Sequence, residues 1–198
     1  MRIAGVVVAG GLGRRIGGTD KALLPLAGLP LIAHVLNRLR PQVQALAINA
    51  NGDLARFAAF GIPVLPDSIP DFPGPLAGLL AGLDWAMAEG FAAVVTVAVD
   101  TPFLPPDLVA QLQARIGAAT VAMAASDGRL HPTCALWRVE LQPALIAALA
   151  AGERRVARFA EAQALVRVGF ATGAPDPFFN INTAEDLAMA ETLIRGAA

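Results

Sequence analysis

The sequence of 198 residues is poor in cysteine, with Cys134 as its single thiol. One cysteine cannot form a disulfide within the chain, which fits a reducing compartment. The apolar run after Arg2 reaches only Ala9 before glycines and arginines follow, so it is too short for the core of a signal peptide. No stretch approaches the ~18 consecutive apolar residues of a membrane helix. We therefore expect a soluble protein of the cytoplasm, with no membrane partner.

The sequence also lacks an excess of charge of either sign. Its net charge is −1, with 15 basic and 16 acidic residues, so the overall charge does not indicate a nucleic-acid partner. Hydrophobic residues make up 56% of the chain, which argues against disorder and favours a well-buried sheet. No internal repeat, linker or low-complexity segment divides the chain, and its length predicts a single α/β domain over residues 1–198.

Lysine is the scarcest charged residue, and the only one, Lys21, closes the most informative stretch of the sequence. That stretch begins with the apolar run 3–9, which is typical of a strand buried on both faces. Five glycines and two arginines follow between residues 10 and 18. Because glycines let backbone N–H groups approach phosphate oxygens and cations balance the charge, this loop predicts a phosphate-binding cradle. The alternative is a flexible surface loop with incidental charge.

Two common phosphate-binding motifs do not fit this loop. In the P-loop a glycine precedes the lysine, whereas Asp20 precedes Lys21 here. The dinucleotide fingerprint requires a third glycine at the position where this chain has Ile16. The loop therefore belongs to neither of these two classes.

Polar residues lie at the carboxyl ends of three expected strands. The strands span residues 44–49, 62–65 and 92–99, and the polar residues are Asn49, Asp67 and Asp100. In an open α/β sheet ligands bind beyond the carboxyl ends of the strands, so these groups should meet the glycine-rich loop at one rim. Asp100 is a candidate ligand of Mg²⁺, which takes one or two carboxylates plus substrate phosphates. The alternative for Asp100 is an Asx turn.

Helices alternate with these strands along the chain. Periodicity and start or stop signals predict helices over 31–40, 53–60, 76–89, 107–116, 141–151 and 184–194, and further strands over 119–124, 132–139 and 165–168. Gly78 and Gly82 lie inside the third helix, where each is ~1 kcal/mol less favourable than alanine. A close approach by a ligand or by a neighbouring backbone would explain such glycines, and for Gly82 we favour plain packing of the helix on the sheet. Thr183 and Asp186 have the spacing of a capping box.

In their order along the chain, these motifs resemble the nucleotidyltransferases with a Rossmann-like fold, and among them the molybdenum cofactor guanylyltransferases. The loop of that family reads (L/V)-A-G-G-x-x-x-R-(M/I)-G-G-x-(D/P)-K, and residues 8–11, 15–18 and 20–21 match it in spacing. The segment Gly74-Pro75-Leu76-Ala77-Gly78 matches the guanylyltransferase branch. Asn180-Ile181-Asn182-Thr183 matches a motif near the end of the family. The resemblance covers the whole chain.

The resemblance implies a three-layer α/β fold with a mostly parallel central sheet and helices on both faces. It implies transfer of GMP from GTP to the phosphate of the molybdopterin cofactor, with Mg²⁺ on Asp100. Protein partners that deliver the cofactor, and client molybdoenzymes, are implied as well.

The resemblance also assigns the residues of the site. It gives catalytic roles to Arg15, Lys21 and Asp100. Around the nucleotide it places Val8, Ala9, Gly10, Gly11, Gly13, Lys21, Asn49, Asp67 and Asp100. Toward the molybdopterin it places Gly78, Arg155, Asn180 and Asn182. For Arg155 the alternative is a solvated start of a helix.

Two other functions remain open at this point. One is a nucleotidyltransferase of the same fold that uses CTP or a sugar phosphate, and the segment 74–78 speaks against it. The other is a non-catalytic nucleotide-binding adaptor, and the intact set of Arg15, Lys21 and Asp100 speaks against that.

Overall fold

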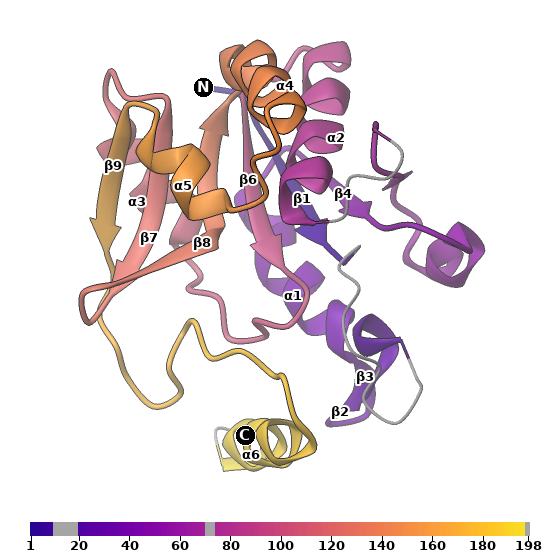
Figure 1. The fold of residues 1–198 in the computed structure, drawn as a ribbon. Helices are drawn as coiled ribbons and strands as arrows, with labels where there is room; N and C mark the ends of the chain where they lie inside the picture. The colour runs from indigo at the N-terminus through magenta and orange to yellow at the C-terminus, as the bar shows by residue number, and fades with distance from the viewer. Residues whose placement is uncertain (10–19, 70–73, 197–198) are drawn as a thin grey trace.

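The computed structural model describes residues 1–9, 20–69 and 74–196, and these form a seven-stranded sheet flanked by helices (Figure 1). The order of the strands across the sheet is β5-β4-β1-β6-β8-β7-β9. Their bounds are β1 (Ile3–Val8), β4 (Ala45–Asn49), β5 (Val64–Leu65), β6 (Ala93–Ala98), β7 (Val121–Ser126), β8 (Arg129–Arg138) and β9 (Leu165–Gly169).

The sheet is mostly parallel, as expected. Only β8 runs against its neighbours, because it is antiparallel to both β6 and β7. The tight turn between β7 and β8 puts Asp127 and Gly128 at φ 48° and 75°, a conformation that suits a two-residue hairpin loop. The parallel pairs β5–β4, β4–β1 and β1–β6 therefore bring the carboxyl ends of four strands to one edge of the sheet.

Helices cover both faces of the sheet, so the expected three layers are confirmed. In Figure 1, α2 (Pro75–Ala88), α4 (Gln142–Ala150) and α5 (Val156–Glu161) lie in front of the sheet, whereas α1 (Leu31–Leu39) and α3 (Leu108–Ile116) lie behind it. Successive side chains of β1 alternate between the two layers: Val6 packs with the front helices and Val7 with the back helices. A strand buried on both faces explains the continuous apolar run in the sequence.

Short 3₁₀ helices and a small hairpin complete the connections. They are η1 (Lys21–Leu23), the hairpin β2 (Pro25–Leu26) and β3 (Leu29–Pro30), η2 (Arg40–Gln42), η3 (Leu54–Phe60) and η4 (Val139–Leu141). The helix expected over 53–60 is thus a 3₁₀ helix. The side chain of Asp53 caps it as expected, and Gly61 ends it at φ 63°.

Two differences from the sequence pattern have simple causes. The pattern does not predict α5, because its six residues are too few to show a helical period. The expected strand 132–139 begins earlier in the structure, because β8 starts at Arg129, directly after the turn that follows β7. Pro132 therefore lies inside β8. Proline cannot donate a hydrogen bond to a sheet, and the register between β7 and β8 shifts between Met123 and Ala125.

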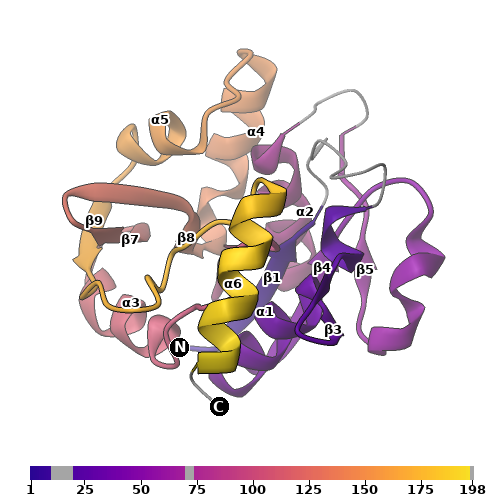
Figure 2. The ribbon, with the colours of Figure 1, turned by 90° about the horizontal axis from the view of Figure 1, so that it is seen from below.

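The last helix, α6 (Ala184–Gly196), lies across the carboxyl edge of the sheet when the molecule is seen from below (Figure 2). Ala190 of this helix packs in a third apolar cluster with Leu26, Leu31, Phe103 and Ile181. The expected capping box is confirmed, since Asp186 N donates to Thr183 Oγ1 at 3.1 Å and Thr183 N donates to Asp186 Oδ2 at 2.9 Å. Within the described ranges we find no helix with the length and apolar character that a membrane crossing needs.

The front layer contains a buried polar contact whose loss can be measured. Trp137 Nε1 donates to Thr96 Oγ1 at 3.0 Å, and both side chains are buried. We expect Thr96→Val to lower the free energy of unfolding by about 1–3 kcal/mol, because the indole N–H is left without an acceptor. Urea denaturation measures this loss. In a Trp137→Phe background the same substitution should cost little, and an equal cost in both backgrounds would contradict the assignment.

Candidate nucleotide-transfer site

The side chain of Lys21 is the meeting point of three distant segments. Lys21 Nζ donates to Asp100 Oδ2 at 2.6 Å and to Asn182 Oδ1 at 3.0 Å. Lys21 opens η1, and Asp100 follows the end of β6. Asn182 lies just before the cap of α6. The structure therefore brings together an ammonium, a carboxylate and an amide beyond the carboxyl end of the sheet, in agreement with the expected position of ligands in such folds.

The segment 180–182 runs directly beside Asp100. Ile181 N donates to the backbone oxygen of Asp100 at 3.0 Å, and Thr101 Oγ1 donates to Asn180 Oδ1 at 2.8 Å. Val99 N donates to Val8 O at 3.1 Å, which continues the pairing of the β6 end with β1. The backbone around Asp100 is thus held from two sides, and its carboxylate points to the rim where Lys21 lies.

A second polar group forms where β4 and β5 end. Asn49 is buried, and its Nδ2 donates to Asp67 Oδ1 at 2.9 Å and to Leu65 O at 3.1 Å. Val8 pairs with Asn49 across the sheet, and Ala9 N donates to Asn49 O at 2.8 Å. The four residues expected near the nucleoside, Val8, Ala9, Asn49 and Asp67, therefore do lie together.

Asn51 belongs to the same group, and sequence reasoning missed it. Asn51 Nδ2 donates to Asp67 Oδ2 at 2.7 Å, while Asp67 N donates to Asn51 Oδ1 at 2.9 Å. The two amides of Asn49 and Asn51 thus hold both oxygens of the Asp67 carboxylate. An available signal was the spacing of Asn51 two residues after Asn49, which puts a second amide just past the end of the strand.

Gly78 lies against Asn49, on the side of the rim where β4 ends. A Cβ at Gly78 would lie 2.1 Å from Asn49 Oδ1, so no larger residue fits without moving the carboxamide. A Cβ at Gly82 would lie 3.0 Å from Val6 Cγ2. Gly82 therefore serves the packing of α2 on the sheet, as expected, whereas Gly78 makes room for a polar side chain of the site.

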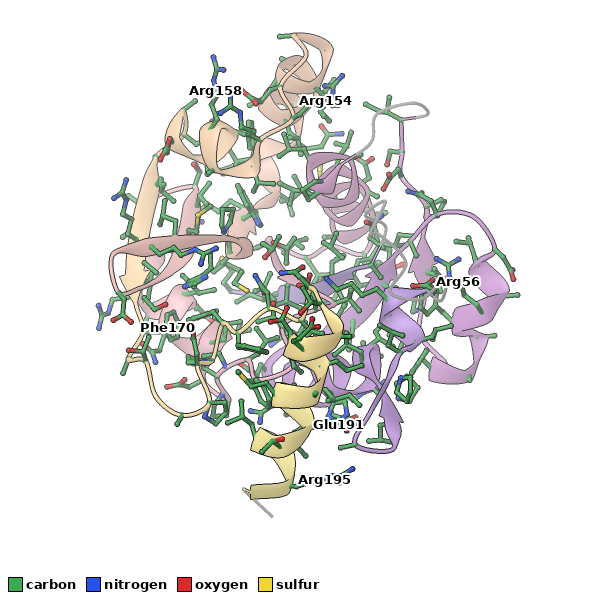
Figure 3. All side chains as sticks on the ribbon, turned by 60° about the horizontal axis from the view of Figure 1, so that its bottom comes forward. Arg56, Arg154, Arg158, Phe170, Glu191 and Arg195 are labelled. Atoms are coloured by element: carbon green, nitrogen blue, oxygen red, sulfur yellow. The ribbon has the colours of Figure 1, made fainter. Side chains whose placement is uncertain are left out.

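Arg155 is an exposed residue at the turn between α4 and α5, directly before the first residue of α5. Glu153 Oε1 accepts from the backbone N–H groups of Arg154 and Arg155 at 2.9 Å each, and these bonds lower the pKa of the Glu153 carboxyl. This turn lines a depression of about 510 Å³. Among the described residues, no hydrogen bond or ion pair joins Arg155 to Lys21 or Asp100. Figure 3 shows the neighbours Arg154 and Arg158 at one edge of the molecule.

Several expected site residues lie outside the described residues. They are Gly10, Gly11, Gly13 and Arg15 of the glycine-rich loop. The described chain ends at Ala9 on one side of this loop and resumes at Asp20 on the other, and both ends lie at the rim.

The side chains of Cys134 and His131 both lie on β8, and burial shifts the pKa of each. Burial raises the pKa of Cys134 to about 12, so its thiol stays protonated. Burial also lowers the pKa of His131, whose ring stacks on Phe178 at 4.1 Å between centroids and whose Nε2 lies 2.7 Å from Ser126 Oγ. The thiol of Cys134 is therefore not a nucleophile, and the ring of His131 is held between Phe178 and Ser126.

The donor set at the rim fits a magnesium ion bound jointly with phosphates. Within the described ranges no group of three or more His, Cys, Asp or Glu side chains could hold a metal by itself. Mg²⁺ does not require such a cage, since one or two carboxylates and substrate phosphates suffice. Asp100, with a side chain 21% exposed, provides one such carboxylate.

The architecture is that of nucleotidyltransferases. The structure superimposes on molybdopterin-guanine dinucleotide biosynthesis protein A from Archaeoglobus fulgidus with a TM-score of 0.76 and 24% identity, over 98% of this chain and 99% of that one. It superimposes equally well, with a TM-score of 0.76 and 13% identity, on 4-diphosphocytidyl-2C-methyl-D-erythritolsynthase from Anaerococcus prevotii, over 98% and 96%. Because these two proteins are named for different nucleotides, the fold alone does not determine which base is used.

Sequence similarity identifies the family. The MobA-like NTP transferase domain matches residues 5–167. The chain is 55% identical over 196 residues to the molybdenum cofactor guanylyltransferase of Rhodobacter capsulatus, and 53% identical over 197 residues to that of Cereibacter sphaeroides. Each alignment covers 98% of both chains. The chain belongs to the MobA-like NTP transferases, on the branch of the molybdenum cofactor guanylyltransferases, which confirms the resemblance found in the sequence.

The contact between Gly78 and Asn49 can be tested by adding one methyl group. Gly78→Ala gains ~1 kcal/mol of helix propensity. We expect a net loss of stability all the same, since the buried carboxamide of Asn49 must leave its two acceptors, at about 1–3 kcal/mol. Thermal and urea denaturation measure the difference.

Two comparisons make this result specific. Gly82→Ala, four residues further along the same helix, meets only apolar atoms of Val6 and Val94, at 3.0 Å or more, and should cost less. In an Asn49→Ala background, Gly78→Ala should become neutral or stabilising, because the clashing oxygen is gone. If Gly78→Ala has the same effect with and without the Asn49 side chain, the contact is not the cause.

Proposed function

We propose that this protein transfers GMP from GTP to the phosphate of the molybdopterin cofactor. A phosphate oxygen of the cofactor attacks the α-phosphorus of GTP, the bond from that phosphorus to the bridging oxygen breaks, and pyrophosphate leaves. The product is the guanine dinucleotide form of the cofactor. The observation that carries the proposal is the meeting of Lys21 and Asp100 at the strand ends, in a chain 53–55% identical to relatives named for this reaction.

Lys21 supplies positive charge where two anionic substrates must approach each other. The ammonium is held close to Asp100 and Asn182, and its side chain is only 14% exposed, so its charge is weakly screened by water. An ammonium in this place lowers the repulsion between the phosphates and stabilises the charge of the leaving pyrophosphate. Arg15 and the backbone N–H groups of Gly10, Gly11 and Gly13 are proposed to act on the same triphosphate.

Asp100 is the residue that would hold a divalent metal, for which we propose Mg²⁺. A nucleotidyltransferase acting on GTP typically uses such an ion, and when bound it neutralises phosphate oxygens and aligns them for in-line displacement. The contribution of this chain is the placement of the carboxylate. The bond from Ile181 N to the Asp100 carbonyl and the pairing of Thr101 with Asn180 orient it before substrates arrive.

The two substrates occupy opposite sides of Lys21 in this proposal. The nucleoside of GTP lies near Val8, Ala9, Asn49 and Asp67, where two amides hold a carboxylate in a fixed orientation. Molybdopterin lies toward Asn180, Asn182 and Arg155, the first two of which border Asp100 and Lys21.

The contribution of Gly78 runs through Asn49, the residue against which it packs. A side chain at this position would displace the carboxamide and so reshape the nucleoside side of the rim, although the sequence resemblance assigns Gly78 to the molybdopterin. Binding of GTP and of molybdopterin to a Gly78 variant, measured separately, would tell these two assignments apart.

We further propose that the reaction takes place in the cytoplasm, with residues 1–198 acting as one domain. The single thiol, Cys134, is buried and free, which agrees with a reducing compartment. Proteins that deliver the molybdopterin cofactor, and client molybdoenzymes that take up the product, are the partners that this reaction implies.

Loss of either central charge should stop the reaction in a folded protein. We expect Lys21→Ala and Asp100→Ala each to reduce turnover by about 10²- to 10³-fold, the size of effect seen when one electrostatic stabiliser is removed from an active site. Turnover is measured as pyrophosphate released in the presence of molybdopterin, GTP and Mg²⁺. Arg195→Ala, an exposed arginine in the last turn of α6, serves as the control. Near-normal turnover in either variant would remove that residue from the mechanism.

The choice of base is tested by the same assay with competing nucleotides. We expect pyrophosphate release to depend on molybdopterin and to be supported by GTP in preference to CTP. A preference for CTP would instead indicate a cytidylyltransferase. Nucleotide binding without pyrophosphate release would support the adaptor function.

A further inference from the structure

Arg56 holds the residue that precedes the catalytic lysine. Arg56 Nε donates to Asp20 Oδ2 at 2.6 Å, and the other oxygen of the same carboxylate, Oδ1, accepts from Ala22 N at 3.0 Å. Asp20 thereby caps η1, the 3₁₀ turn that Lys21 opens. Both carboxylate oxygens are in use, one on the turn and one on the guanidinium, so the position of Arg56 is transmitted to the backbone of Lys21.

The guanidinium of Arg56 is itself held on several sides. Its Nη1 donates to Asn51 O at 2.9 Å and also to the backbone oxygen of Asp53. The guanidinium carbon lies 4.4 Å from the centroid of the ring of Phe57, which is fully buried. The side chain of Arg56 is 21% exposed. A planar group with donors at fixed angles can satisfy these partners together, whereas a single ammonium cannot.

The same residue connects the two sides of the site. On one side it reaches Lys21 through Asp20. On the other, its bond to the backbone of Asn51 supports the residue whose side chain clamps Asp67. Figure 3 shows Arg56 on the side of the molecule formed by the first part of the chain, well separated from Arg154 and Arg158.

We propose that Arg56 is a positioning residue for guanylyl transfer, which fixes the turn of Lys21 through Asp20. The inference rests on the proposed function, since it assumes that Lys21 acts on the triphosphate. A three-residue 3₁₀ turn has little internal hydrogen bonding to define its own orientation. The Asp20 cap and the Arg56 anchor therefore decide where the ammonium stands when it turns from Asp100 to a phosphate.

The size of the expected effects separates positioning from a merely structural role. The contacts of Arg56 lie at a partly exposed part of the surface, so their loss should leave the protein folded. Displacing a reacting group by about 1 Å can slow a reaction by about 100-fold. A positioning residue should therefore affect turnover far more than stability.

The first test compares two substitutions of Arg56 with a matched control. We expect Arg56→Ala to lower kcat by about 10- to 100-fold with little change in the KM for GTP, in a protein that still unfolds cooperatively. Arg56→Lys should remain impaired, because the ammonium cannot serve Asp20 and both carbonyl groups at once. Arg167→Ala, which removes an exposed arginine whose Nη2 lies 4.0 Å from Glu161 Oε1, should behave like the unsubstituted protein.

The second test asks whether the effect passes through Asp20. Asp20→Asn keeps an oxygen for the cap on Ala22 but replaces the charged acceptor that faces Arg56. In a double-mutant cycle on kcat, we expect the double variant to be no slower than the slower single variant, since both changes break the same link. Additive losses would overturn the proposal. So would recovery of kcat in Arg56→Lys, or a loss confined to the KM for GTP, which would indicate direct contact with the nucleotide.

Lys21→Ala, measured in parallel, keeps the two proposals separable. If Lys21→Ala retains turnover, the proposed role of the lysine fails and the role of Arg56 fails with it. If Lys21→Ala is inactive while Arg56→Ala is fully active, only the positioning role of Arg56 is overturned. The proposal is supported when both variants lose turnover and the loss at Arg56 depends on Asp20.

Discussion

The site depends on the two hydrogen bonds that the ammonium of Lys21 donates, one to the carboxylate of Asp100 and one to the amide oxygen of Asn182. They join the first βα connection, the end of the central strand β6 and the approach to the last helix. A positive charge that is only 14% exposed needs partners of this kind, because the alternative is a poorly solvated ion. The same contacts place the charge where phosphates can reach it, beyond the carboxyl ends of parallel strands.

On the side of the rim that contains Asn49, close packing rather than charge fixes the position of the polar side chain. Asn49 is buried beneath α2 and can keep its amide on Asp67 only because residue 78 has no side chain. A glycine inside a helix lowers helix stability by ~1 kcal/mol relative to alanine. Here the loss of helix propensity at residue 78 is offset, because the glycine leaves room for the buried Asn49 amide to donate to both of its acceptors.

In this family the side chains at the rim, rather than the fold, determine which substrate is used. Two proteins, one named for a guanine dinucleotide and the other a diphosphocytidyl synthase, superimpose on this chain with the same TM-score of 0.76. The sheet therefore provides a common rim, and the residues along it select the chemistry. The relation to guanylyltransferases at 53–55% identity over nearly the whole chain carries the information on substrate that the fold lacks.

Local pattern alone determined much of this protein. The apolar run of β1, the polar ends of β4 and β6 and the capping box at Thr183 are all readable from nearest neighbours, because they depend on periodicity and turn chemistry. Tertiary structure decided what those patterns could not express. It places Gly78 against Asn49 and brings Asn182 into hydrogen-bond contact with Lys21, 161 residues away in the sequence. It also brings Arg56 to the carboxylate of Asp20. Such contacts join segments far apart in the chain, and only the folding of the sheet brings them within hydrogen-bond distance.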